Sequence, residues 1–269
     1  MDMAIFELLA VLVGAVTGVC AGLLGVGGGL LYVPALLFLL PRQGVADAIL
    51  MHVAVASSLA AIVVTSLSSL IGHARLRGIL WSYVRWLALG IVPGAFLGSI
   101  SARYIDGMML RILYGAFAVL VGLKMAVGWA PTASRPRPLP AAMSGVGALI
   151  GMVSAWLGIA GGTLTTPYLV WRSTPIRQAI GTSAACGFPI ALVAATSYGL
   201  LNPETIPGGA RVDGLTGLLY WPVIIPLMLG SMVGAGYGAR LTHRMPVERL
   251  RKGFAMLLVV LGVAVWCKL

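Results

Sequence analysis

Two glycine-rich stretches interrupt long apolar segments of this sequence. Gly27, Gly28 and Gly29 form the first, Gly161 and Gly162 form the second, and a proline stands five residues after the last glycine of each. A helix that restarts after such a break presents unpaired backbone N–H groups and the positive end of its dipole. Two such helix starts facing each other would bind an oxyanion without a buried Lys or Arg. The alternative is a kink that lets helices pack closely, but the duplication favours a binding site.

Short hydroxyl-bearing runs follow both breaks. Hydroxyl groups donate hydrogen bonds to anion oxygens and are less costly to bury than charges. The same groups also form interhelical hydrogen bonds in membranes, so both interpretations stay open. The candidates for the anion site are Ser57, Ser58, Thr163, Gly181, Thr182 and Ser183, with Thr165 and Thr166 as further hydroxyls after the second break.

Two ionisable residues precede the hydroxyl runs. His52 is a candidate proton relay or anion contact, or else an interhelical hydrogen-bond partner, and Arg177 is placed to neutralise the anion at a cytoplasmic mouth. All seven Asp and Glu residues fall in loops or at segment ends. The chain therefore lacks the intramembrane carboxylate that many ion-coupled carriers use, and the charge of the substrate would supply the driving force.

The composition gives no support to enzymatic chemistry. The three His and three Cys do not cluster, and the HExxH, GxGD and GxSxG patterns are absent. A metal centre needs several such ligands together, and a nucleophile needs an adjacent base. We therefore predict no metal, no cofactor and no enzymatic activity.

The overall composition predicts the environment of these residues. Of the 269 residues, 59% are hydrophobic and only 9% are charged, and the mean hydropathy is +1.00. So few charges cannot cover a water-facing surface of this size. We therefore predict an all-α, polytopic integral membrane protein in a bacterial inner or plasma membrane, with the lipid bilayer around it. The net charge of +11 fits basic cytoplasmic loops, and the basic residues lack the pattern of a nucleic-acid surface.

Breaks in the apolar pattern divide the chain into eight membrane segments. A spanning helix takes about 20 apolar residues. The segments cover residues 4–40, 46–71, 79–102, 108–130, 141–171, 175–200, 215–239 and 246–267. A proline-rich linker at 131–140 separates an N-terminal transmembrane repeat (1–130) from a C-terminal one (141–269).

The two repeats match in order. The glycine–proline elements match at an offset of 133 residues and the hydroxyl runs at 125. Gly94 and Gly98 match Gly230 and Gly234 at 136, in stripes whose small-xxx-small spacing predicts helix packing. Internal repeats are typical of secondary transporters, whose sites lie at the repeat interface.

The length of the broken segments predicts that the repeats are inverted. Segment 4–40 would be about 55 Å long as one helix, against a hydrocarbon core of roughly 30 Å. We therefore expect a crossing helix and a shorter one that turns back, followed by about three spanning helices per repeat. The five residues Arg42, Arg103, Arg111, Arg211 and Lys268 then lie outside the cytoplasm, with both termini, and the other 13 basic residues lie inside.

With these residues in view, the sequence resembles the TauE/SafE family of sulfite exporters, or anion permeases. The resemblance rests on Gly22 to Pro34, His52 to Leu59, Gly161 to Pro167 and Arg177 to Ser183, and it covers essentially the whole chain. It implies a carrier of sulfite, thiosulfate, sulfoacetate or a related organosulfonate. Ser57 stands where the family more usually has Thr, which keeps a hydroxyl but departs from strict two-fold symmetry.

Together these features predict a transporter, with export as the expected direction, for a small sulfur oxyanion or organosulfonate such as sulfite. The anion would be held at the broken-helix N-termini near the bilayer midplane. The alternatives are an importer or a channel for another small anion, such as thiosulfate or an organic acid, on the same fold. The oligomeric state stays open, with a homodimer as one option.

Overall fold

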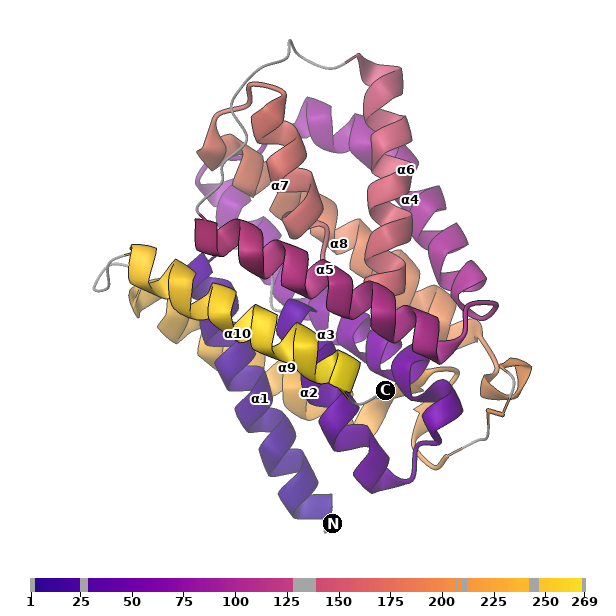
Figure 1. Cartoon of the computed structure of the whole chain (residues 1–269). Coiled ribbons are helices and arrows are strands. Elements are labelled where there is room, and N and C mark those ends of the chain that lie inside the picture. Colours follow the sequence, from indigo (N-terminus) through magenta and orange to yellow (C-terminus); the bar gives the residue numbers. More distant parts are fainter. Residues whose placement is uncertain are drawn as a thin grey trace.

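A computed structural model describes residues 3–24, 29–127, 139–206, 208–209, 212–241 and 247–267. Within these residues the chain forms ten α-helices, two short 3₁₀ helices and one β-hairpin (Figure 1). The α-helices are α1 (Met3–Leu24), α2 (Gly29–Leu39), α3 (Asp47–Arg75), α4 (Trp81–Ala102), α5 (Gly107–Val127), α6 (Pro140–Leu157), α7 (Gly162–Trp171), α8 (Ile176–Leu200), α9 (Trp221–Leu241) and α10 (Val247–Cys267). The short elements are η1 (Leu40–Gln43), η2 (Pro203–Thr205), β1 (Leu215–Thr216) and β2 (Leu219–Tyr220).

The helices confirm the predicted all-α, polytopic membrane class. Among the described residues, six helices are long and apolar enough to cross a membrane: α1, α3, α4, α5, α6 and α8. Apolar side chains on outer faces, such as Leu8, Leu97 and Leu120, are more than half exposed. Such a surface suits lipid and not water. The chain is therefore a multi-pass membrane protein.

The connections between helices gather at two ends of the bundle. At one end, which we call the hairpin end, the α8–α9 connection with the hairpin lies beside the start of α3, because the Cβ of Ala48 lies near Gly208. At the other, the linker end, the α3–α4 turn lies beside the first turn of α8, since Gly78 lies near the carbonyl of Arg177. Residues 131–138 of the predicted linker lie outside the described part, and Pro140 begins α6.

The segment α6–α7 begins and ends at the linker end. Near the start of α6, Ser144 donates a hydrogen bond to the carbonyl of Trp86 in the early part of α4 (2.9 Å). Near its end, the Trp156 indole donates to Ser101 near the end of α4 (3.0 Å). After the break α7 runs back, because Tyr168 shares a hydrophobic cluster with Tyr83 at the start of α4.

The segment α1–α2 begins and ends at the hairpin end. Glu7 in α1 lines a groove together with Gly214 beside the hairpin and Trp221 at the start of α9. After its own break, α2 leads through η1 directly into the start of α3, which lies at the same end. The two broken segments therefore start from opposite ends of the bundle.

Close helix packing joins the two halves. Helix α1 packs along α9, α4 packs along α6, α5 packs against α10, and α3 crosses α8 in the middle of the molecule (Figure 1). A Cβ at Gly94 would lie 2.1 Å from the carbonyl oxygen of Ala148, and one at Gly234 would lie 2.1 Å from that of Ala15. Only glycine permits these approaches, so the packing interpretation of the glycine stripes is confirmed.

The packing also changes the expected correspondence of the stripes. Ala15 and Ala148 are 133 residues apart, the same offset as the two breaks, so their partners Gly94 and Gly234 are equivalent. Gly94 and Gly234 are 140 residues apart, which differs by about one helical turn from the offset of 136 that the sequence match suggests. A second difference lies at the start of the seventh segment, where residues 215–220 form the hairpin and the helix begins only at Trp221.

Candidate anion site

The two breaks meet in the interior of the bundle. Gly29 begins α2, and a Cβ added to it would lie 3.0 Å from the Cα of Ile159 and 3.2 Å from the amide nitrogen of Ala160 in the second break. The same Cβ would press on Ile62 of α3. Gly27 and Gly28 lie outside the described residues. The end of the first break therefore abuts the second.

The second break is closed by a tight turn. Gly158 ends α6 in the left-handed region at φ 66°, and its amide donates to the carbonyl of Ser154. Gly161 then precedes α7, and its carbonyl accepts from Leu164 (3.1 Å) and Thr165 (2.7 Å). The amides of Gly162 and Thr163 lie in the first turn of α7 and have no intrahelical acceptor, so they face the break. These amides lie at the N-terminal end of α7, which is the positive end of the helix dipole.

Ser58 from the first half contacts this second break directly. It is fully buried, and its hydroxyl donates to the carbonyl of Gly158 (2.8 Å). Its counterpart Ser183 stays within its own half, where it bonds to Thr166 (2.7 Å) and donates to the carbonyl of Ile180 (3.0 Å). The second residues of the two hydroxyl runs thus have different partners.

The first residues of the two runs have equivalent partners. Ser57 accepts a hydrogen bond from the amide of Tyr220 (3.1 Å), directly before α9. Thr182 accepts one from the amide of Leu80 (3.0 Å), directly before α4. Both hydroxyl residues are fully buried. Ser57 lies on the hairpin side of the breaks and Thr182 on the linker side, so the structure does not bring these two side chains together.

The remaining predicted residues lie toward the two ends of the bundle. A Cβ at Gly181 would lie 2.4 Å from the carbonyl of Gly78, which places it at the linker end. Arg177 is exposed in the first turn of α8 at the same end. His52 is buried near the hairpin end, where its Nε2 donates to two carbonyl oxygens that close α4, those of Ala102 (3.0 Å) and Ile105 (3.1 Å).

Sequence reasoning missed one polar residue at the second break. Ser154 is fully buried, and its hydroxyl has no hydrogen-bond partner among the described residues. The hydroxyls of Thr163 and Thr165, which the sequence did indicate, likewise have no partner there, although only Thr165 is a fully buried residue. Comparison of the repeats concealed Ser154, because Ala21 occupies the equivalent position at the offset of 133.

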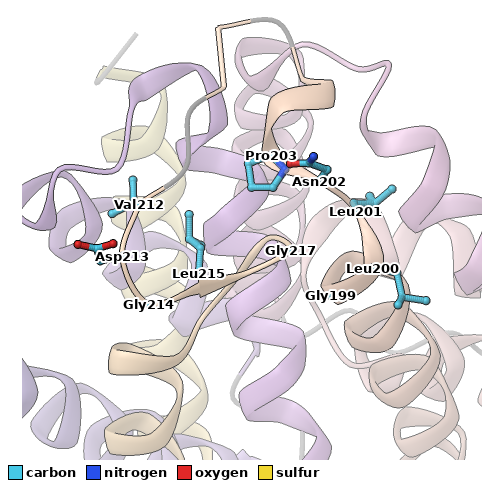
Figure 2. Close-up of a pocket in the computed structure, with 10 residues that line it drawn as sticks. All are labelled: Gly199, Leu200, Leu201, Asn202, Pro203, Val212, Asp213, Gly214, Leu215 and Gly217. Atoms are coloured by element: carbon cyan, nitrogen blue, oxygen red, sulfur yellow. The ribbon is translucent and has the colours of Figure 1, made fainter.

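A separate pocket of about 500 Å³ lies at the hairpin end, between the end of α8, η2 and the hairpin (Figure 2). Asn202 and Asp213 are the polar side chains among the residues that line it. An acidic side chain disfavours an anion, so this pocket does not extend the candidate site. Within the described residues, no three His, Cys, Asp or Glu side chains gather as metal ligands would.

Broken helices that meet in the interior of a membrane bundle are typical of secondary transporters. A profile of the family described as Sulfite exporter TauE/SafE matches residues 10–265, and the chain belongs to this family of membrane transporters. No solved structure matches the chain.

Relatives of this chain share its full length. A probable membrane transporter protein of Haemophilus influenzae is 35% identical, over 98% of this chain and 99% of its own. One of Xylella fastidiosa is 33% identical, over 94% and 91%. A probable membrane transporter protein of Methanocaldococcus jannaschii is 25% identical, over 95% and 93%. These names describe membrane transport without naming a substrate.

Proposed function

We propose that this transporter exports a small sulfur oxyanion or organosulfonate, such as sulfite, and that the anion binds where the two breaks meet. The observation that carries the proposal is the contact of Gly29 with Ile159 and Ala160. It joins the start of α2 to the break that precedes α7. Amides and helix dipoles at such a place favour negative charge. The family described as sulfite exporters supports the choice of substrate.

We further propose that the two halves are inverted repeats. When each helix is replaced by its equivalent in the other half, the pair α1–α9 becomes the pair α6–α4. The helices of both pairs are packed together. The same replacement turns the Ser57–Tyr220 hydrogen bond into the Thr182–Leu80 bond. The broken segments start from opposite ends. Inverted repeats permit alternating access by rocking of one part against the other around a fixed site.

The distribution of basic residues orients the proposed cycle. Loops with most of the 18 Lys and Arg residues belong at the linker end, which we therefore place in the cytoplasm. An anion leaving a negative interior gains about 2.3 kcal/mol per elementary charge per 100 mV. The membrane potential can thus drive export without a coupling ion.

Flux in liposomes tests the proposed function. The purified protein would be reconstituted, and movement of labelled sulfite would be measured with and without an imposed potential. We expect saturable flux that increases with the potential and supports countertransport. Flux that neither saturates nor shows countertransport would indicate a channel, and flux of a carboxylate with none of sulfite would overturn the substrate.

A matched pair of glycine variants tests the location of the site. Gly29→Ala places a methyl group between the two breaks, whereas Gly72→Ala adds one where no atom lies within 4 Å. We expect Gly29→Ala to abolish saturable sulfite flux and Gly72→Ala to leave it unchanged. Normal flux in Gly29→Ala would place the anion elsewhere.

A further inference from the structure

Buried hydroxyls without partners surround the start of α7. Thr165 is fully buried, its Oγ1 has no hydrogen-bond partner among the residues that the structure describes, and a Cβ at Gly161 would lie 3.2 Å from that oxygen. The hydroxyl therefore faces the second break. The hydroxyl of Thr163 has no partner either. Since buried polar groups in proteins nearly always have partners, these hydroxyls point to a ligand.

Ser154 adds a further donor from α6. The same Cβ at Gly161 would lie 3.5 Å from Cγ2 of Ile150, so this face of α6 is turned toward the break. Ser154 lies one helical turn further along that face, fully buried and without a partner for its hydroxyl. Three hydroxyl groups from two helices thus adjoin one positive helix end.

The first break lacks this set. At the offset of 133, Ala21 replaces Ser154, Leu30 replaces Thr163 and Tyr32 replaces Thr165. The longer side chain of Tyr32 carries its hydroxyl to the neighbourhood of Thr17 in α1 and Ser231 in α9. The donors are therefore unequally divided between the halves.

Apolar side chains adjoin the second break. The side chains around it include Ile62 of α3, Ile150 of α6 and Ile190 of α8, none of which titrates. Arg172 follows the last residue of α7, where its guanidinium lies over the ring of Trp171 (5.2 Å). The guanidinium also lies over the ring of Tyr168 (5.9 Å), in the second half of α7 and away from the helix start. Uncharged donors alone would have to stabilise a bound ion.

We propose that the second break anchors the transported anion through Ser154, Thr163, Thr165 and the first amides of α7, and that it selects singly charged oxyanions. Hydrogen sulfite and simple alkanesulfonates belong to this class, whereas sulfate does not. The electrostatic cost of burying an ion increases with the square of its charge, so neutral donors compensate one charge far better than two. This inference rests on the proposed anion-transport function.

Binding to the full-length protein in lipid nanodiscs tests the charge selection. Isothermal titration calorimetry would compare methanesulfonate, a permanent monoanion, with sulfate, a dianion. We expect methanesulfonate to bind at least about tenfold more tightly than sulfate. Sulfite should bind more tightly as the pH is lowered from mildly alkaline to mildly acidic, while methanesulfonate binding stays constant. Tighter binding of sulfate than of methanesulfonate would overturn the selection.

Variants of single hydroxyls test the anchor. Thr165→Val and Ser154→Ala should each weaken methanesulfonate binding by about tenfold, the usual effect of a lost hydrogen bond to a charged group. The thermal stability of both variants should not fall without ligand, because neither hydroxyl has a hydrogen-bond partner within the described part of the chain. Thr165→Ser should retain binding.

Two controls separate the possible failures. Thr196→Val removes an exposed hydroxyl that bonds only within its own helix, and Tyr32→Phe removes the hydroxyl at the equivalent position of the first half. Both should bind methanesulfonate like the unaltered protein. Unchanged binding in Thr165→Val would overturn the anchor while the proposed function stands. If the unaltered protein neither binds nor transports any anion, both proposals fail.

Discussion

Each half of the transporter places one buried hydroxyl under the first turn of a helix from the other half. Ser57 accepts a hydrogen bond from the amide of Tyr220, directly before α9, and Thr182 accepts one from the amide of Leu80, directly before α4. One residue further on, the halves differ, because Ser58 bonds across to Gly158 whereas Ser183 bonds to Thr166 beside it.

This contrast separates residues that hold the helices together from residues that surround the two breaks. Helices α4 and α9 both need a partner for the amide at their start, which is partly buried at α4 and buried at α9, so the bond is present in both halves. Under the proposed function, the polar residues around the two breaks serve one small ligand, which has no two-fold symmetry of its own. The proposed inverted repeats would thus preserve the packing of the bundle while the two halves of its site diverge.

The largest expected effect comes from the packing that the halves share. Gly94→Ala and Gly234→Ala each place a methyl group 2.1 Å from a carbonyl oxygen of the neighbouring helix. Such overpacking must move a backbone, and we expect each variant to lose about 3 kcal/mol of stability. Thermal unfolding in detergent would measure it.

The control for this pair lies in α6. Gly145 has no atom within 4 Å of an added Cβ, so Gly145→Ala should keep or slightly raise the unfolding temperature. A large loss in Gly94→Ala with none in Gly234→Ala would contradict the equivalence of the two contacts.

The hydroxyls under α4 and α9 should show the next largest effect. Ser57→Ala leaves a buried amide without an acceptor, which costs about 1–3 kcal/mol, and Thr182→Val does the same to a partly buried amide. We expect both variants to unfold at a lower temperature, Ser57→Ala by at least as much as Thr182→Val, and Thr182→Ser should restore stability. Thr196→Val is the matched control, because its hydroxyl is exposed. If Ser57→Ala loses binding but no stability, its hydroxyl serves the anion instead.

Ser58 and Ser183 should differ, which sharpens the comparison. Ser58→Ala removes the donor to the carbonyl of Gly158, so we expect it to lose about 1 kcal/mol and to loosen the second break. Ser183→Ala should lose less, because its bonds lie within its own half. Hydrogen exchange of the amides at 158–165 would report the difference. Equal protection of these amides in the two variants would contradict a role of Ser58 in holding the second break together.

Much of this architecture follows from the sequence. Apolar segments of membrane-spanning length predicted the helices, because a bilayer leaves the backbone few alternatives. The two glycine-rich interruptions predicted where helices break, and the structure ends α1 at Leu24 and α6 at Leu157 beside them. Glycine at every fourth position predicted close packing, which Gly94 and Gly234 confirm.

Other features could not be read from the residues alone. Glycines that recur every four residues fit equally well after a shift of one turn, so the match at 136 looked as good as the packing offset of 140. A buried hydroxyl suits a helix start and an anion equally well, so only the contact of Ser57 with Tyr220 reveals its partner. The hairpin at 215–220 is apolar and resembled the start of a helix.

The smallest expected effect concerns a pair of equivalent positions at opposite ends. His52 and Arg177 are 125 residues apart, the offset of the hydroxyl runs, yet His52 is buried against the end of α4 while Arg177 is exposed at the linker end. An exposed charge near a mouth acts on the approach of an ion and is screened by salt. Arg177→Gln should therefore slow sulfite entry from the linker end by about twofold at low ionic strength. The rate should return to normal at high salt, with no change in binding affinity at the second break. A defect that persists at high salt would instead place Arg177 in direct contact with the transported anion.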